Sequence, residues 1–350
     1  MLLYLHIPFC DSKCHYCAFN SYVDKFELKE QYMKTILTQL SNEIKRFNLL
    51  ENSIESFFIG GGTPSTITPK LYEPFFSLIK PYLKKNAEIT TEANPNSATA
   101  IWLQGMQKLG VNRISFGVQS FDEDKLKMLG RNHGKKMAIE AINNAKKIGF
   151  KNISLDLIYG TSQDTKKLLF KDLTIAISLR IDHISAYSLT LEDNTPFINT
   201  PKVQNDDEDL AYWFINEIEK KGFPQYEISN FGKKKSKHNL GYWQYKNYIG
   251  IGSGAVGFLE NRRFYTDNNI ESYIKNPLLI DEEMLNNEAI KSEQILLGLR
   301  SIVGFSKDIL TSCEYKNVET LLKEKKLTQL NDRFFNTNYF LSDEIALFIT

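Results

Sequence analysis

The chain has 350 residues, of which 42% are hydrophobic and 24% charged, as is ordinary for a globular protein. Its 43 basic and 42 acidic residues give a formal net charge of +1, so no overall field points to nucleic acid or to a membrane surface. No apolar run approaches the roughly 20 residues of a membrane-spanning helix, and the length predicts one large domain of about 200–250 residues with a smaller appendage.

The N-terminal segment favours a strand over a signal peptide. The sequence MLLYLHIPFC has neither the basic flank nor the small-residue cleavage site of a secretory leader. Three of the four cysteines then fall within eight residues, whereas a secreted disulfide framework uses more cysteines, in pairs, over a shorter chain. We therefore predict a cytoplasmic protein whose clustered thiols hold a metal site.

Strand-like and helical segments alternate along the next two hundred or so residues. Runs rich in Ile, Val, Phe and Tyr predict strands at 2–7, 56–59, 88–92, 112–118, 152–159 and 183–189. An apolar stripe at spacings of three or four from Leu28 to Phe47 predicts the first helix. Further helices are predicted at 69–84, 98–109, 134–148, 164–179 and 206–221, the last of them capped by Asn205 ahead of four acidic residues.

Six strands that alternate with helices predict an α/β fold with a parallel sheet. A barrel or partial barrel fits better than an open sheet, because polar motifs follow nearly every strand and barrel sites collect at the strand C-termini. After about residue 230 the chain becomes dense in Gly and Tyr, and a charged, helical tail begins near 283. We predict a barrel domain over 1–230, a connecting segment over 231–280, and a small, mainly helical C-terminal domain over 281–350.

The cysteine loop is the most informative motif. Cys10, Cys14 and Cys17 form a CxxxCxxC array directly after the first predicted strand. Three thiolates on one short loop can bind three irons of a [4Fe-4S] cluster and leave the fourth iron free to chelate the amino and carboxylate groups of S-adenosylmethionine. An electron from the cluster can then cleave the sulfonium to a deoxyadenosyl radical. Two other interpretations compete: zinc with His6 or His15 as the fourth ligand, and three unrelated core cysteines.

The segment YLHIPFCDSKCHYCAFNSY (4–22) resembles the opening of the radical-SAM proteins that group with oxygen-independent coproporphyrinogen III oxidase. In detail it is most similar to the haem chaperones of that family. The likeness covers positions 2 to about 260 well and the tail only loosely. It implies a radical-SAM type of barrel that carries a [4Fe-4S] cluster on Cys10, Cys14 and Cys17, with exchangeable S-adenosylmethionine. Tyr4 and Tyr16 resemble the family's cofactor-contacting aromatics, with plain packing under the loop as the alternative.

Polar motifs at successive strand ends fit the same resemblance. In this family the GGGTP loop meets the methionine part of the cofactor, which implies that Gly61, Gly62 and Thr63 contact it here. The alternative is a tight turn without a ligand. A cofactor with ribose hydroxyls, an ammonium and a carboxylate needs acceptors and one bidentate cation. The residues in the family's order are Glu92, Gln119 and Asp156 as acceptors and Arg131 as the cation, although each alone is equally compatible with a structural salt bridge.

Three features place the chain with the haem chaperones and not with the oxidases. Phe19 stands where the oxidase pattern has a fourth cysteine, and the chain starts nine residues before the cysteine cluster, without the extension typical of oxidases. The segment KHNLGYW (237–243) matches the HNxxYW motif of the chaperones. The match implies His238 as a haem-iron ligand, unless it is a core or capping histidine. The lysines just upstream are hypothesised to attract the haem propionates, unless they form a solvated loop.

The chain departs from the family at two places: Val256 replaces the histidine of GxGAHG, and the loop at 159–165 reads YGTSQDT without its usual proline. We predict a haem chaperone that works with an electron donor and delivers haem to unidentified acceptor proteins, transient membrane-associated ones among them, as a monomer or dimer without nucleic acid. The alternatives are a coproporphyrinogen III oxidase, whose activity we do not expect, and a structural zinc protein. No catalytic residue is assigned, and Cys313 is given no role.

Overall fold

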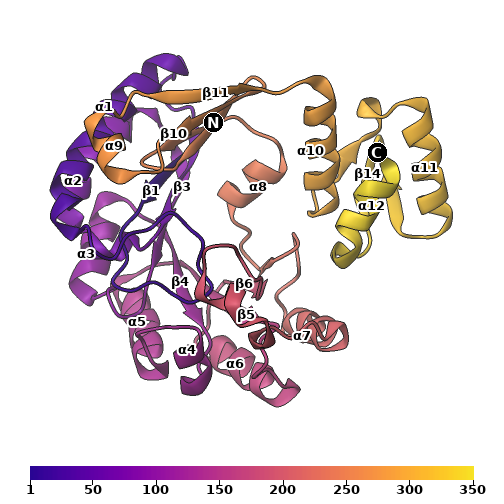
Figure 1. The fold of residues 1–350 in the computed structure, drawn as a ribbon, viewed down its shortest axis with the longest axis horizontal. Coiled ribbons are helices and arrows are strands. Elements are labelled where there is room, and N and C mark those ends of the chain that lie inside the picture. Colours follow the sequence, from indigo (N-terminus) through magenta and orange to yellow (C-terminus); the bar gives the residue numbers. More distant parts are fainter.

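An eleven-stranded sheet runs through most of the molecule, which the computed structural model describes over residues 1–350 (Figure 1). Its strands in chain order are β1 (Leu2–Ile7), β2 (Ile54–Gly61), β3 (Leu83–Ala93), β4 (Arg113–Gln119), β5 (Asn152–Tyr159), β6 (His183–Ser188), β7 (Asn230–Gly232), β8 (Tyr248–Ile251), β9 (Val256–Leu259), β10 (Arg262–Thr266) and β11 (Ile280–Met284). Strands β1 to β6 lie side by side in chain order and run parallel. The two ends of the sheet, β11 and β7, do not pair. The predicted partial parallel barrel is therefore confirmed, as an open one.

The segment after β6 extends both edges of the sheet. β7 pairs antiparallel with β6 at one edge, and β8 pairs in parallel with β1 at the other. β9, β10 and β11 then continue from β8 as an antiparallel meander. The Gly- and Tyr-rich stretch after residue 230 thus contributes β8 and β9 to the same sheet as the six parallel strands.

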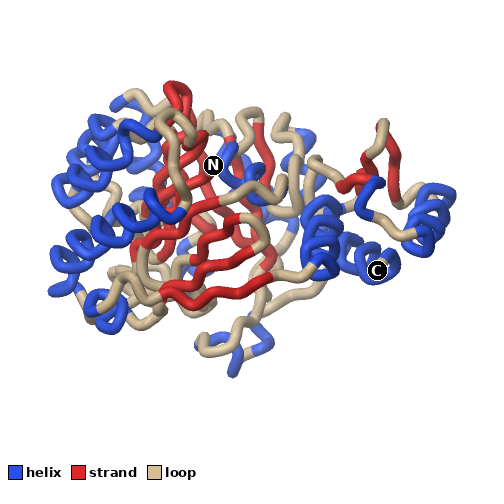
Figure 2. The backbone as a smooth tube through the Cα atoms, turned by 90° about the horizontal axis from the view of Figure 1, so that it is seen from above, coloured by secondary structure: helices blue, strands red, loops and turns tan.

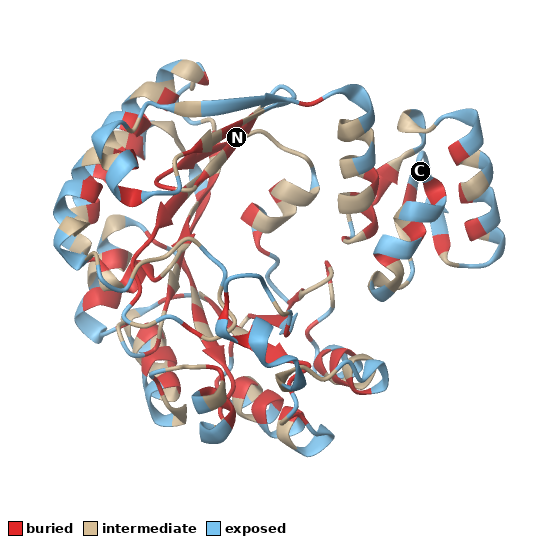
Figure 3. Ribbon diagram, in the orientation of Figure 1, coloured by how far each residue is buried: buried red, intermediate tan, exposed pale blue.

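Helices cover the outer face of the sheet (Figure 2). They are α1 (Lys29–Arg46), α2 (Pro69–Ile79), α3 (Ala100–Leu109), α4 (Glu123–Met128), α5 (Lys135–Ile148), α6 (Lys166–Ser178), α7 (Glu208–Lys220) and α9 (Ile270–Lys275). In α1, the residues Tyr32, Ile36 and Leu40 recur every four positions and are fully buried, so one stripe of this helix packs on the core. Figure 3 shows the same division for the other outer helices, with buried residues toward the sheet and exposed ones toward solvent.

Helix α8 (Lys237–Trp243) is the exception, because it lies inside the curve of the sheet, between the barrel wall and the C-terminal part (Figure 1). Ser236 caps it, its hydroxyl accepting a hydrogen bond from the amide of Asn239 at 3.2 Å. Gly241 faces Leu2 so closely that a Cβ there would lie 2.6 Å from the leucine side chain. Because Leu2 opens β1, α8 sits beside the N-terminal ends of the parallel strands.

The C-terminal part has a core of its own. It consists of α10 (Asn287–Leu299), α11 (Ser312–Lys323) and α12 (Ser342–Ile349), with a three-stranded antiparallel sheet of β12 (Phe305–Ser306), β13 (Leu327–Leu330) and β14 (Arg333–Asn336). Phe305 and Phe334, from paired strands, are buried in this core. A mainly helical C-terminal domain was expected from the sequence. The strands were not, because none exceeds four residues and their exposed side chains hide any alternation.

Two local differences from the expected elements have physical reasons. Helix α2 ends at Ile79 and not near 84, because Lys80–Tyr82 forms a 3-10 turn around Pro81 and β3 begins at Leu83. The cap of α7 is Asp207 and not Asn205: the Asp207 carboxylate accepts from the Leu210 amide at 3.0 Å. The short helix α4 was not predicted. None of the helices has the length and apolar content that crossing a bilayer requires.

Candidate functional site

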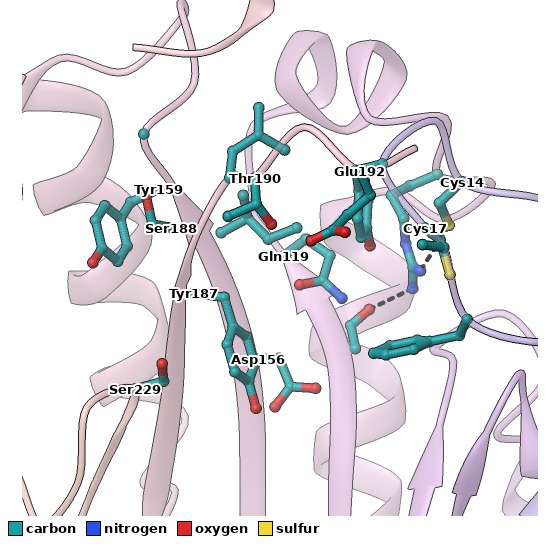
Figure 4. Close-up of a pocket in the computed structure, with 18 of the residues that line it drawn as sticks. Cys14, Cys17, Gln119, Asp156, Tyr159, Tyr187, Ser188, Thr190, Glu192 and Ser229 are labelled. Carbon is teal, nitrogen blue, oxygen red and sulfur yellow. Dashed lines mark hydrogen bonds between the residues drawn. The ribbon is translucent and has the colours of Figure 1, made fainter. Parts of the chain in front are cut away.

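A cavity of about 1080 Å³ opens at the C-terminal ends of the parallel strands (Figure 4). The structure brings most of the site residues expected from the sequence to its wall: Cys10, Cys14, Tyr16, Cys17, Gly61, Gly62, Thr63, Glu92, Gln119, Arg131 and Asp156. Tyr4 and His238 do not line it. The far side carries Tyr339, Phe340 and Asp343, so the C-terminal part completes the cavity.

The cysteine loop is tied to the strands on either side of it. The Cys10 amide donates to the carbonyl of Tyr22 at 2.9 Å, and the Tyr22 amide donates to the carbonyl of Pro8 at 2.7 Å, which closes the loop. The Thr63 hydroxyl lies 3.4 Å from the Cys10 sulfur. Burial raises the pKa of the Cys10 and Cys17 thiols, so a bound cation is needed to hold them as thiolates.

The sulfur atoms do not converge on a single point. No group of three or more His, Cys, Asp or Glu side chains is placed to hold one metal ion. Zinc needs its ligands around one centre, whereas an iron–sulfur cluster takes each thiolate on a different iron. His6 already uses both ring nitrogens, for the Asn20 carbonyl at 2.8 Å and the Tyr4 hydroxyl at 3.0 Å. The His15 Nδ1 atom is bonded to the Met128 carbonyl at 2.8 Å. This geometry fits a cluster better than the zinc alternative.

The glycine loop after β2 owes its composition to protein packing. Gly61 has a φ of +110°, and a Cβ on it would lie 2.6 Å from the His6 ring. A Cβ on Gly62 would lie 3.0 Å from the Cys10 sulfur and 2.9 Å from the Phe9 carbonyl oxygen. The missing side chains let the loop approach β1 and the cysteine loop, and both glycines also line the cavity.

Arg131 joins the cysteine loop to the strand ends. Its Nη1 atom lies 3.3 Å from the Cys14 sulfur, and its Nη2 atom donates to Asn94 Oδ1 at 2.8 Å and to the Gly117 carbonyl at 2.6 Å. Its buried Nε–H has no partner. A buried donor without an acceptor is costly, so this atom fits an anionic ligand group in the cavity. Sequence reasoning missed Asn94, which also donates to Thr63 at 3.1 Å and was recognisable only as a polar residue two places after Glu92.

Glu92 and Asp156 put two carboxyl groups on the cavity wall. Burial raises the pKa of Glu92 to about 8, with the nearby Asp156 adding to the shift, although the Gly61 amide donates to Glu92 at 3.2 Å. Burial also raises the pKa of Asp156 to about 6, against the effect of the hydroxyls of Ser185 and Ser115. A cation placed between these groups would restore their charge, so the pair fits an ammonium-bearing ligand.

Gln119 ends β4 in a strained conformation. Its φ is +66°, unusual for a residue with a Cβ, and the register with β5 shifts beside it. The turn directs the amide into the cavity, on the same side as Asp156 and Tyr187 (Figure 4). Strain of this kind is typical of a ligand-binding position.

Tyr4 and His238 belong to an aromatic stack inside the barrel, and neither lines the cavity. The Tyr4 ring lies 6.2 Å from the Phe58 ring, and Phe58 lies 5.1 Å from His238, centroid to centroid. The His238 Nδ1 atom is 2.8 Å from the Ser56 hydroxyl, and its Nε2 atom is 3.1 Å from the Tyr242 hydroxyl. Burial lowers the pKa of His238 to about 3, so this ring is neutral. As placed here, His238 anchors α8.

The lysine run before α8 also lies far from the cysteines. Lys234 pairs with Asp182 at 3.0 Å, and Lys237 donates to the Asn86 carbonyl at 3.2 Å. Asp182 and Asn86 lie near the N-terminal ends of β6 and β3, the end opposite to the cavity. Val256, where the family has histidine, begins β9 and does not line the cavity either.

The comparisons with known proteins come from sequence and from structure. The family model of the Radical SAM superfamily matches residues 4–169. The heme chaperone HemW of Bacillus subtilis is 35% identical over 322 residues, covering 87% of this chain and 84% of that one. The heme chaperone HemW of Escherichia coli is 41% identical over 265 residues, 73% and 69% of the two chains. The coproporphyrinogen III oxidase HemN of Escherichia coli shares the fold, with a TM-score of 0.82, 18% identity, and coverage of 99% and 89%.

Proposed function

The chain belongs to the Radical SAM superfamily and, within it, to the family of the heme chaperones HemW, and on this premise we propose that it binds haem and passes it to acceptor proteins. The relatives named as chaperones match over most of both chains, and this observation carries the proposal. Membership of the superfamily implies a [4Fe-4S] cluster and S-adenosylmethionine.

We propose that Cys10, Cys14 and Cys17 would hold the cluster, whose fourth iron supplies a binding point for S-adenosylmethionine and whose electron supplies its reductive cleavage. Arg131 would donate its free Nε–H to the carboxylate of S-adenosylmethionine. Glu92 would accept a hydrogen bond from the ammonium group. Gly62 lets the loop after β2 pass close to the Cys10 sulfur, which a Cβ at this position would meet at 3.0 Å.

Haem ligation by His238 forms part of the proposal, with one structural condition. Both ring nitrogens are hydrogen-bonded and only 2% of the residue is exposed, so α8 has to leave its place before the imidazole reaches iron. Hemin titration tests this step. We expect His238→Ala to lose most of the Soret shift, and Ser56→Ala, which frees Nδ1 without removing the ring, to keep or strengthen it. Unchanged hemin affinity in His238→Ala would exclude ligation by this residue.

The oxidase is the second candidate, because its fold matches nearly the whole chain and the cavity is large. At 18% identity this likeness concerns the fold alone. Phe19 lines the cavity, 70% exposed, where the oxidase pattern implies a cysteine. An anaerobic assay with reconstituted protein, coproporphyrinogen III, reductant and S-adenosylmethionine distinguishes the two candidates. We expect hemin binding without formation of protoporphyrinogen in the same sample, and turnover would favour the oxidase.

Two kinds of protein partner complete the proposal. A haem-acceptor protein, which can be membrane-associated, receives the haem. An electron donor reduces the cluster. Haem transfer is measured by mixing the hemin-loaded chain with a candidate apo-acceptor and following the acceptor's own Soret spectrum. Transfer at the rate of free hemin release would argue against a delivery role.

A further inference from the structure

A second hollow lies on the outer side of the cysteine loop. It has a volume of about 700 Å³, and its wall, almost wholly polar, comes from the cysteine loop and from the segment at 123–134. Its wall residues include Lys13, His15, Asp124, Lys127, Gly130 and Arg131. We call this hollow the outer groove. The cavity described above and the outer groove share Ser12, Lys13 and Arg131 in their walls.

The wall between the outer groove and Cys14 is thin and rigid. Arg131, which lines both hollows, places Nη1 3.3 Å from the Cys14 sulfur. The His15 amide donates to the Leu129 carbonyl at 3.1 Å, and a Cβ on Gly130 would lie 2.9 Å from the His15 ring. The cysteine loop and the segment at 128–131 therefore interlock, and an electron carrier in the groove would come within one layer of side chains of a cluster ligand.

The charges around the outer groove favour an acidic partner. Lys13 and Lys127 contribute positive charges to the wall, and Lys127 forms no ion pair within the chain. Of the two acidic residues in the wall, Glu123 accepts a hydrogen bond from the Lys135 amide at 3.0 Å, which fixes its position and leaves its charge in place. Counted with Asp124, it gives two carboxylates against three cations, Lys13, Lys127 and Arg131, so the wall carries an excess of one positive charge. Electron-transfer encounters are small, polar and steered by opposite charges, which suits a groove of this kind.

We propose that the outer groove is the docking surface for an acidic one-electron carrier protein, holding a flavin or an iron–sulfur group, that reduces the cluster. The proposal rests on the proposed function, because it needs a cluster on Cys14. One electron leaves the reduced carrier, which is oxidised by one equivalent, and enters the oxidised cluster, which is reduced by one equivalent. No atom is transferred between the two proteins.

Charge substitutions of opposite sign test the docking surface. In anaerobic stopped-flow mixing of the cluster-loaded chain with a reduced acidic flavodoxin, we expect Lys127→Glu to lower the second-order rate of cluster reduction about tenfold at low salt. Asp124→Lys should raise it. Both differences should shrink as salt rises, because screening weakens the steering. Lys235→Glu, which changes an exposed lysine at the opposite end of the barrel, is the matched control and should react like the wild type.

Two further measurements separate failure of docking from failure of the cluster. Reduction by dithionite, which needs no docking surface, should proceed at one rate in all four proteins. Binding of oxidised flavodoxin to the chain without a cluster, measured by titration, should weaken in Lys127→Glu and strengthen in Asp124→Lys. Equal flavodoxin affinities, or equal reduction rates in the two groove variants, would overturn the proposal even if the cluster itself is confirmed.

Discussion

The two ends of the open barrel treat their buried polar groups in opposite ways. At the C-terminal ends of the strands, Arg131 keeps an unpartnered Nε–H, Glu92 and Asp156 have raised pKa values, and Gln119 has a strained backbone. At the N-terminal ends, the His238 ring is satisfied on both sides. Both ends are polar inside, so polarity alone does not mark a binding site.

The neighbours of α8 show how complete the pairing is at the N-terminal end. The Ser154 hydroxyl lies 2.7 Å from His183 Nδ1, and the Tyr226 hydroxyl lies 2.7 Å from His183 Nε2. Tyr226 in turn accepts from the Ser236 amide at 3.1 Å. A network whose rings and hydroxyls are all hydrogen-bonded has no free donor or acceptor for a ligand, so its role is to stabilise the fold. Compared with this network, the candidate site differs in its incomplete satisfaction and not in its polarity, although Thr90 Oγ1 and Asn230 Oδ1, outside the cavity wall, also lack partners.

His238→Ala should break the N-terminal network. Removing a buried imidazole with two hydrogen-bonded neighbours should lower the free energy of unfolding by about 2–4 kcal/mol, and Ser56→Ala, its milder control, by about 1–2 kcal/mol. Chemical denaturation of the metal-free chain measures both. Because the pKa of His238 is about 3 in the folded chain and near 6.5 when unfolded, its contribution is lost as pH falls below about 6.5. A variant as stable as the wild type would contradict the structural role.

Arg131→Ala should remove the buried, unpaired Nε–H group from the C-terminal ends of the strands. We expect the affinity of the cluster-loaded chain for S-adenosylmethionine to fall by roughly 100-fold, because a buried charge-assisted contact is lost. Arg131→Lys keeps the charge without the planar fork and should lie between. Equilibrium binding gives the affinities, and iron content serves as control because Arg131 also touches Cys14. Normal affinity with normal iron would remove Arg131 from the site.

Glu92→Gln tests the contrast between the two ends of the barrel through the pH dependence of stability. The folded pKa of Glu92, about 8, lies above its unfolded value near 4.5, so the wild type loses stability as pH rises through that interval. The variant should be more stable than the wild type at pH 8 by about 1–2 kcal/mol, with the difference gone near pH 4.5, since the open cavity tempers the burial. Thermal or denaturant unfolding at several pH values measures this. A pH-independent difference would contradict the assignment.

Gln119→Gly should have the smallest effect. Glycine adopts a positive φ freely, so the relief of strain and the added chain entropy should nearly cancel, leaving stability within about 1 kcal/mol of the wild type. Affinity for S-adenosylmethionine should still fall if the amide binds the cofactor. Retained affinity would mean that the side chain is dispensable and that only the bend of the backbone matters.

Much of the fold was predictable because parallel β/α units repeat one simple pattern. All six parallel strands were located from apolar runs. The family was recognised from short motifs, chiefly CxxxCxxC after a strand, and the similarity to known chaperones confirms it. The placement of α8 inside the barrel was not predictable, because a motif with His, Tyr and Trp is equally compatible with a ligand set and with packing. The short strands β13 and β14 were missed because local patterns in four-residue strands carry little information.

Most residues of the candidate site could be predicted from the sequence. The contacts that hold them in place could not. Glu92 and Asp156 were expected from their positions in the C-terminal parts of strands and, with Arg131, from the family's order of motifs, and all three line the cavity. Asn94 was missed, because its bond to Arg131 depends on two loops that only the folded chain brings together. The contact that requires a glycine at Gly61 was not predictable for a similar reason, since its close neighbour, His6, lies far away in the sequence, on β1.

Iron analysis of anaerobically reconstituted protein tests the central claim most directly. We expect about four irons per chain, with a broad absorbance that dithionite bleaches, in the wild type and in Cys313→Ala, which removes an exposed cysteine outside the loop. The triple variant Cys10→Ala, Cys14→Ala, Cys17→Ala should hold almost none. Iron retained by the triple variant, or a colourless wild type that holds zinc, would contradict the assignment of the cavity end as the cofactor site.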